Sequence, residues 1–403
     1  MGDLLFLAHR IPFPPDRGDK IRSFHMLRAL SRRTRVHLAC FADDEADAGH
    51  LEGLRHALGP ALGDAHVEVR RVSKPRAALK ALATGRPLSV TLFDSPALHG
   101  AVQRLLAERP IGTIVAFSSQ MAQYVAADGR RRFVMDFVDM DSAKFADYAA
   151  AGGPLRLVHA REARRLLAFE RATAARADIS LFVSEAEATL FRARTGAKRV
   201  TAIGNGVDLD AFRPGAARAE STGEGPVILF TGQMDYRPNI AAVRTFAEDV
   251  LPLIRAERPD ARFVIAGRAP SPEVLRLAGP AVQVTGAVID MRRWLAAAAV
   301  VVAPLAIGRG VQNKVLEAMA MGRPVVASTA AFTGIDAESG RDLLVADEAA
   351  DLARAVLGLL ARPEAAGAIG RAARAAMERG YSWEARLAGL PELAGLPPLR
   401  DAA

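Results

Sequence analysis

The residues with the clearest capacity for chemistry lie at positions 308–326, which read Gly-Arg-Gly-Val-Gln-Asn-Lys-Val-Leu-Glu-Ala-Met-Ala-Met-Gly-Arg-Pro-Val-Val. A glycine-containing loop enters a helix pattern here. A helix start offers unpaired backbone N–H groups and a positive dipole end, which together can hold a diphosphate. Lys314 adds charge in the first turn, and Glu317, three residues later on the same face, suits the hydroxyls of a ribose. Taken singly, these residues also fit a capping glycine, a surface lysine and a helix-face glutamate. Together they predict a nucleotide-diphosphate site.

Three aspartates, Asp136, Asp139 and Asp141, form a second group directly after an apolar strand pattern. A carboxylate in this place could accept a hydroxyl proton or stabilise a positively charged transition state. Asp139 and Asp141 also have the Asp-x-Asp spacing that can hold a divalent ion. Loop solvation and helix capping account for the same pattern equally well. Because a helix dipole and basic side chains already serve a diphosphate, we expect no metal.

The elements that must position these groups are short apolar runs alternating with longer helical patterns, which is typical of parallel sheets with crossover helices. A Gly-, Pro- and Ser-containing stretch at 214–226 has no periodicity and divides two such series. We therefore predict an α/β protein of two Rossmann-like domains with parallel sheets facing across a cleft, with ligands at the carboxyl ends of the strands. The predicted strands are Leu4–Ala8, Val36–Phe41, Val67–Val72, Thr113–Phe117, Arg132–Asp136, Ile179–Val183, Arg199–Ile203, Val227–Thr231, Arg262–Ala266, Val282–Thr285, Val300–Ala303, Pro324–Ser328 and Leu343–Val345.

Composition bounds the class of protein. The 403 residues suit two domains better than one, and the single cysteine, Cys40, excludes an internal disulfide and a cysteine-based zinc site. The apolar run at the N-terminus is too short for a signal peptide, and the run Trp294–Leu305 is too short to cross a bilayer. We expect a cytoplasmic protein.

The positive charge lies entirely in the first half. Residues 1–213 hold 32 Lys and Arg against 24 Asp and Glu; totals of 53 and 45 leave 21 of each in the rest. Such an excess suits an anionic partner, either nucleic acid or membrane phosphates, or else a solvated arginine-rich surface. With 6% aromatic residues and no recognition motif, we expect no nucleic acid.

The segment from Gly308 to Pro324 closely resembles the hallmark of the retaining glycosyltransferase family 4, which has the GT-B fold. Three further stretches extend the resemblance to nearly the whole chain: Ala-Asp-Ile-Ser-Leu-Phe-Val-Ser-Glu at 177–185, Asn-Gly-Val-Asp at 205–208 and Tyr-Ser-Trp at 381–383. Glu317 matches the second acid of the family motif, whereas Arg309 stands where the first acid is usual. The sequences of residues 234–239, 139–145 and 309–322 are most similar to those of sugar transferases associated with exosortase (PEP-CTERM) exopolysaccharide systems.

The resemblance implies an organisation and a set of contacts. The acceptor domain would span 1–213, the linker 214–226, the donor domain 227–380, and a crossover helix with a tail 381–403. Arg237 and Lys314 would neutralise the departing diphosphate, while Asp139 or Asp141 would act on the acceptor. Residues implied to contact the donor nucleotide are Gly18, Asp19, Gly232, Arg268, Val288, Arg309, Gly310, Val311, Gln312, Asn313 and Glu317. Candidates on the acceptor side are His9, Lys20 and Arg22; the lone histidine and the basic loop equally suit structural roles.

The predicted function is transfer of a sugar, with retention, from a nucleotide-diphosphate sugar to a lipid-linked or saccharide acceptor in exopolysaccharide synthesis. UDP is expected only because the family favours it. No cofactor is expected, and the basic first domain is expected to face the inner membrane surface. Three alternatives stay open: a nucleotide-sugar epimerase of the same fold, a basic nucleic-acid-binding protein, and a non-catalytic subunit, the last prompted by Arg309.

Overall fold

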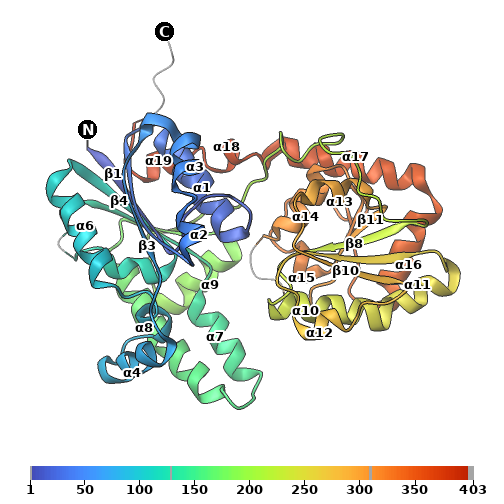
Figure 1. Ribbon diagram of the computed structural model, residues 1–403, viewed down its shortest axis with the longest axis horizontal. Helices are drawn as coiled ribbons and strands as arrows, with labels where there is room; N and C mark the ends of the chain where they lie inside the picture. The colour runs from blue at the N-terminus through green and yellow to red at the C-terminus, as the bar shows by residue number, and fades with distance from the viewer. Residues whose placement is uncertain (1, 128, 308–310, 398–403) are drawn as a thin grey trace, which may run out of the picture. The chain divides into compact units, whose positions relative to one another are not determined.

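The computed structural model describes residues 2–127, 129–307 and 311–397, and the chain forms two compact units (Figure 1). The first unit consists of two segments, one that ends at Gly204 and one that begins at Leu387. The second unit comprises Asn205–Arg386. Each unit contains one wholly parallel sheet with helices packed against it. The predicted α/β class with two Rossmann-like domains is confirmed.

The first unit has a seven-stranded sheet in the order β3-β2-β1-β4-β5-β6-β7. Its central strands β1 and β4 are apolar and buried over most of their length, because helices cover both faces of a parallel sheet. Its strands are β1 (Asp3–Ala8), β2 (Val36–Ala42), β3 (Leu62–Val69), β4 (Ile111–Phe117), β5 (Arg132–Val138), β6 (Ile179–Phe182) and β7 (Val200–Ala202). Its helices are α1 (Gly18–Ser31), α2 (Glu45–Ala48), α3 (Leu51–Leu58), η1 (Gly59–Ala61), α4 (Lys74–Thr84), α5 (Leu88–Thr91), α6 (Pro96–Glu108), η2 (Ser119–Tyr124), α7 (Asp141–Ala150), α8 (Arg156–Arg176), α9 (Glu185–Thr195) and α19 (Leu390–Leu393).

The second unit has a six-stranded sheet in the order β10-β9-β8-β11-β12-β13. The run Trp294–Leu305 is a helix end followed by a buried strand. The strands are β8 (Val227–Thr231), β9 (Arg262–Ala266), β10 (Val282–Gly286), β11 (Val300–Ala303), β12 (Val325–Ala327) and β13 (Leu344–Val345). The helices are α10 (Arg237–Thr245), η3 (Phe246–Val250), α11 (Leu251–Glu257), α12 (Pro272–Leu275), α13 (Met291–Ala297), α14 (Asn313–Ala320), α15 (Thr329–Phe332), α16 (Ala349–Ala361), α17 (Pro363–Gly380) and α18 (Trp383–Arg386).

One strand lies well away from its predicted position. We predicted Val67–Val72, whereas β3 begins at Leu62 and ends at Val69. Glycine and aspartate at its start have low strand propensity and conceal it in the sequence. The glycine has a packing reason: a Cβ on Gly63 would lie 2.7 Å from the His37 ring on the neighbouring strand.

The unit boundaries differ from the predicted domain limits at both crossings. The first unit ends at Gly204 rather than residue 213, because Val207 donates its N–H to the Tyr381 carbonyl, 2.7 Å away, within the second unit. The return crossing falls after Arg386 rather than after residue 380. Beyond it, α19 joins the first unit, where Thr113 and Arg132 donate to the Ala394 and Leu393 carbonyls. Within the described ranges, no helix has both the length and the apolar composition to cross a bilayer.

Candidate functional site

Two glycines fix the backbone at the carboxyl ends of β8 and β9. Gly232 and Gly267 have φ angles of 154° and 153°, in the range that favours glycine. A Cβ on Gly267 would lie 1.6 Å from the Gly232 carbonyl oxygen, so the two loops touch through bare backbone. A Cβ on Gly232 would lie 3.2 Å from the Lys314 amine. We call the backbone at Gly232 and Gly267, at the carboxyl ends of β8 and β9, the glycine edge. It packs directly against Lys314.

Lys314 lies in the first turn of α14, and two side chains hold its amine. The Nζ atom donates to the Asn239 Oδ1 atom at 2.6 Å and lies 4.2 Å from the centre of the Phe230 ring. Asn239 is buried in the first turn of α10, and its Nδ2 atom donates to the Gln233 carbonyl at 2.9 Å. The ammonium is thus held at the edge where a Rossmann-like sheet binds its ligands.

Lys314 and Glu317 lie one helical turn apart on α14, in a protein-lined setting that disfavours charge. Desolvation lowers the pKa of Lys314 to about 7, although the negative charge of Glu317 opposes this shift. Desolvation likewise raises the pKa of Glu317 to about 7, against the attraction of Lys314. Perturbed pKa values of this kind cluster at functional sites. An anionic ligand beside Lys314 would restore its full positive charge.

The start of α14 has the form that anion binding needs. Its N-cap residue, Gln312, makes no side-chain capping hydrogen bond. Val311 is buried, and Asn313 Oδ1 accepts from Asn205 Nδ2 at 3.0 Å, which fixes the entry to the helix. Predicted contacts Arg309 and Gly310 lie outside the described residues.

Three further predicted donor contacts lie at other places in the second unit. Arg237 is exposed at the first residue of α10. Arg268 lies two residues beyond the end of β9, and its carbonyl accepts the Met234 N–H at 2.9 Å. Val288, just beyond β10, packs partly buried against the core of the unit.

In the first unit, a strained turn after β5 positions the aspartates. Val138 has φ of 69°, a conformation that is rare and costly for a β-branched residue and is typical of functional sites. Asp136 supports the turn: its Oδ1 atom accepts the Val138 N–H at 2.9 Å. Its Oδ2 atom accepts from Arg22 Nε at 2.9 Å. Arg22 is 1% exposed, so it holds the turn and does not reach an acceptor in solution.

Asp139 emerges from this turn into a cluster of carboxylates. Its Oδ1 atom is buried and has no hydrogen-bond partner among the described residues. Burial, together with the negative charges of Glu187 and Asp141, raises the pKa of Asp139 to about 7. Asp141 is stabilised differently, by Ser119 Oγ at 3.1 Å and by an ion pair with Lys144. The two acids of the Asp-x-Asp triplet therefore have different environments, and Asp139 is suited to exchange a proton near neutral pH.

Asp139→Asn is expected to raise the free energy of unfolding, and to raise it more at pH 8 than at pH 5. The native pKa of about 7 lies above the ordinary value of 3.8, so the native state binds more protons between those limits. Stability contributed by the protonated group is present at low pH and is lost as pH rises through 7. Thermal unfolding of both proteins at the two pH values measures the difference. An equal effect of the substitution at pH 5 and pH 8 would contradict it.

The predicted contacts near the end of β1 form a closed network of ion pairs. Asp19, next to Gly18 at the start of α1, accepts from His9 Nε2 at 3.1 Å and from Arg10 at 2.7 Å. Burial opposes ionisation of Asp19, but the hydrogen bond and charge of His9, with the arginines, hold its pKa well below its usual range. Lys20 is 4% exposed and pairs with Asp47. Asp19 and Lys20 thus neutralise neighbours within the first unit.

Three residues that the sequence did not single out belong to these sites: Asn239, Glu187 and Glu170. Glu187 Oε2 accepts the Met140 N–H at 2.8 Å and raises the pKa of Asp139. Glu170 is fully buried against Ser142, and burial raises its pKa to about 8. A glutamate on the apolar face of a helix was the available signal for Glu170. For Asn239 and Glu187 only the fold gives the proximity.

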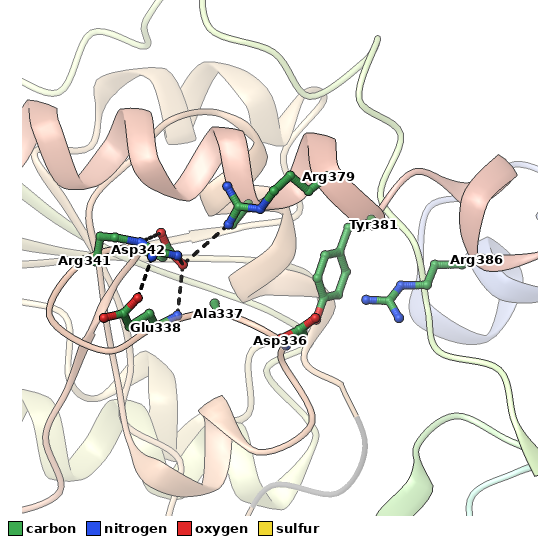
Figure 2. A pocket seen from close by; sticks show the side chains of 10 residues that line it. Asp336, Ala337, Glu338, Arg341, Asp342, Arg379, Tyr381 and Arg386 are labelled. Atoms are coloured by element: carbon green, nitrogen blue, oxygen red, sulfur yellow. Dashed lines mark hydrogen bonds and ion pairs between the residues drawn. The ribbon is translucent and has the colours of Figure 1, made fainter.

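Figure 2 shows a separate pocket of about 320 Å³ in the second unit, between α17 and the segment that leads into β13. Its charges neutralise one another: Asp342 accepts from Arg341 Nε at 3.0 Å and lies 3.9 Å from Arg379. Arg386 lies 3.9 Å above the Tyr381 ring. Nothing predicted for the donor lies in this pocket.

Metal-ligating side chains do not gather in the part of the chain that the structure describes. No group of three or more His, Cys, Asp or Glu residues there is arranged to hold an ion.

The second unit has a recognisable sequence family. Residues 225–362 match the profile of the family described as Glycosyl transferases group 1. A phosphatidyl-myo-inositol mannosyltransferase of Propionibacterium freudenreichii subsp. shermanii is 34% identical over 158 residues, which are 38% of this chain and 39% of that protein. The match thus spans well under half of the mannosyltransferase.

The fold extends over nearly the whole chain in solved structures. Anabaena Alr3699/HepE in complex with UDP and glucose superposes with a TM-score of 0.68 at 17% identity, covering 97% of this chain and 99% of that one. Sucrose-phosphate synthase from Thermosynechococcus elongatus gives a TM-score of 0.72 at 19% identity, covering 98% of each. The chain therefore has the GT-B fold, with a Glycosyl transferases group 1 sequence in residues 225–362 of its second unit.

Proposed function

We propose that the protein is a glycosyltransferase that moves a hexose from a nucleotide-diphosphate sugar, with UDP as the nucleotide, to an acceptor hydroxyl. The observation that carries this proposal is the Lys314 amine, held by Asn239 against the glycine edge at the start of α14. A cation, a helix N-terminus and bare backbone at the carboxyl ends of parallel strands together suit a diphosphate.

The comparisons support the same activity. The matched mannosyltransferase transfers a sugar, and HepE of Anabaena has been solved with UDP and with UDP-glucose. The family match covers the glycine edge, Asn239, Lys314 and Glu317 together.

On the donor side, the bond between the sugar C1 and the β-phosphate oxygen breaks, and its electron pair leaves with the diphosphate. Lys314 and the N–H groups of α14 stabilise that developing charge, so the proposed reaction needs no metal. Glu317 accepts hydrogen bonds from the ribose. Arg237 adds positive charge from the adjoining helix start.

On the acceptor side, the first unit supplies the acid–base group. Asp139 takes the proton of the acceptor hydroxyl as the new bond to C1 forms, and Asp141 stabilises positive charge on the sugar. Transfer with retention places the new bond on the face that the diphosphate leaves. We further propose a lipid-linked or saccharide acceptor, reached at the membrane surface by the basic first unit, and a role in exopolysaccharide assembly.

The test is metal-free transfer. Protein in EDTA is incubated with UDP-glucose, UDP-N-acetylglucosamine, UDP-glucuronate or GDP-mannose, with and without a lipid-phosphate acceptor, and release of nucleotide diphosphate is measured. We expect acceptor-dependent release of UDP from at least one donor, lost in Lys314→Ala. Calorimetric titration with UDP and GDP in EDTA and then manganese identifies the base.

Other outcomes discriminate among the alternatives. Interconversion of the donor sugar without release of UDP would show an epimerase. Binding only with manganese would assign Asp139 and Asp141 to a metal. No binding of any nucleotide diphosphate would overturn the proposal in favour of a non-catalytic subunit.

A further inference from the structure

The exposed large apolar side chains of the first unit gather on two neighbouring segments. Leu79 and Leu82 on α4 are 70% and 68% exposed. Leu155, Leu157 and Val158, at the entry to α8, are 56%, 72% and 49% exposed. We call these five residues the leucine surface. All the exposed large apolar residues among the first unit's described residues belong to it.

The leucine surface does not arise from loose packing of α4. This helix buries Ala77 and Ala81 against the unit and turns its two leucines outward. Its smallest apolar residues therefore make the internal contact and its largest meet water. A surface helix of a soluble domain normally has the reverse arrangement. An outward apolar face rimmed by charge is typical of a binding surface.

The two segments form one continuous structure. Arg161, one turn beyond the apolar entry to α8, donates through NH2 to the Ala81 carbonyl at 2.7 Å. Buried Glu162 accepts the N–H groups of Leu88 and Ser89 at 2.7 and 2.8 Å, which ties α8 to the segment after α4. Figure 1 shows α4 and the α7–α8 pair at the same end of the first unit.

The rim of this surface is strongly basic. Positions 71–86 and 151–165 contain nine Lys and Arg residues and a single acid, Glu162, which is 3% exposed. Lys74, Arg76, Arg156 and Arg164 are exposed. Three of the nine cations pair with acids outside these segments: Arg71 with the exposed Glu45, and Lys80 and Arg86 with the largely buried Asp94. Apolar side chains amid an excess of cations complement a layer that has anionic headgroups over hydrocarbon. A nucleic acid offers phosphates but nothing for the leucines.

We propose that α4 and the start of α8 dock on an anionic lipid bilayer, with the leucines inserted below the headgroups and the basic rim on the lipid phosphates. The proposal rests on the membrane association proposed for the first unit and assigns it to particular residues. Docking at this surface would keep the enzyme beside a lipid-linked acceptor.

Co-sedimentation of the full chain with vesicles tests the assignment. We expect binding to phosphatidylcholine vesicles containing phosphatidylglycerol, weaker binding to phosphatidylcholine alone, and weaker binding as salt is raised. The double variant Leu79→Ser/Leu82→Ser should bind the anionic vesicles about 10-fold more weakly or worse. Lys74→Gln/Arg76→Gln should lose about 10-fold and show a smaller salt dependence. Leu253→Ser/Leu275→Ser, on exposed leucines of the second unit, is the matched control and should bind as wild type.

Thermal unfolding checks that each variant is folded, and calorimetry with UDP separates the two proposals. Vesicle binding that is equal in wild type and in the leucine variant would overturn the docking surface. The proposal would also be overturned if the wild type bound RNA but not vesicles, and the leucine variant bound RNA equally well. A wild-type dimer that the leucine variant dissociates would assign the surface to a second copy and overturn lipid docking. Vesicle binding without UDP binding would leave the surface standing and remove the glycosyltransferase function.

Discussion

Lys314→Ala is expected to lower kcat/KM for sugar transfer about 100- to 1000-fold, because the lost cation stabilises the charge that develops on the departing diphosphate. The amine is held in place by Asn239 before any ligand binds, so little reorganisation is needed. Steady-state release of UDP measures the loss. Since desolvation lowers the pKa of Lys314 to about 7, UDP affinity in the wild type should fall as pH rises above 7.

The controls for this prediction distinguish a specific cation from general charge. Lys198→Ala removes an exposed lysine of the first unit and should leave kcat/KM unchanged. Asn239→Ala keeps the lysine but removes its acceptor, and we expect an intermediate loss of about 10-fold. A Lys314→Ala variant with wild-type kcat/KM and unchanged pH dependence would contradict the proposed role.

Gly267→Ala is expected to lower the free energy of unfolding of the second unit by about 3 kcal/mol or more and to abolish UDP binding. The added Cβ would lie 1.6 Å from the Gly232 carbonyl oxygen, and backbone on both loops must move to admit it. Displacing Gly232 also disturbs the space beside Lys314. Differential scanning calorimetry measures the stability, and titration with UDP measures the binding.

Gly279→Ala is the matched control for this substitution. Gly279 lies in the same unit, and a Cβ there would meet no atom within 4 Å. We expect a change of no more than about 0.5 kcal/mol and unaltered UDP binding. If both alanine variants unfold alike, the contact between the two glycine loops is not what fixes this edge of the sheet.

Much of the fold could be predicted because buried parallel strands leave an unbroken apolar run in the sequence. β8, β9 and β11 begin and end at the predicted residues. β3 could not be placed as well, since Gly63 is required by the His37 ring on the next strand and not by strand propensity. The boundary at Gly204 depends on a hydrogen bond between residues 207 and 381, which no local pattern contains.

In the candidate sites, too, local patterns could be predicted and contacts between distant residues could not. The positions of Lys314 and Glu317, one turn apart on α14, could be predicted because a helix start is a local pattern. Their contacts with a nucleotide stay predictions. Lys20 was predicted to face an acceptor, whereas it is buried and paired with Asp47, 27 positions along the chain. A basic loop and a buried ion pair have the same sequence pattern. The partnership of Asn239 with Lys314 spans 75 positions and follows from the strand order alone.

The return of the chain to the first unit at Leu387 bears on how the protein is made. The N-terminal unit emerges from the ribosome first, yet α19, which accepts hydrogen bonds from Thr113 and Arg132, is synthesised after the whole of the second unit. The second unit is continuous and can fold as it emerges. During translation, the first unit therefore stays incomplete until the second unit and the segment from Leu387 onward have been synthesised.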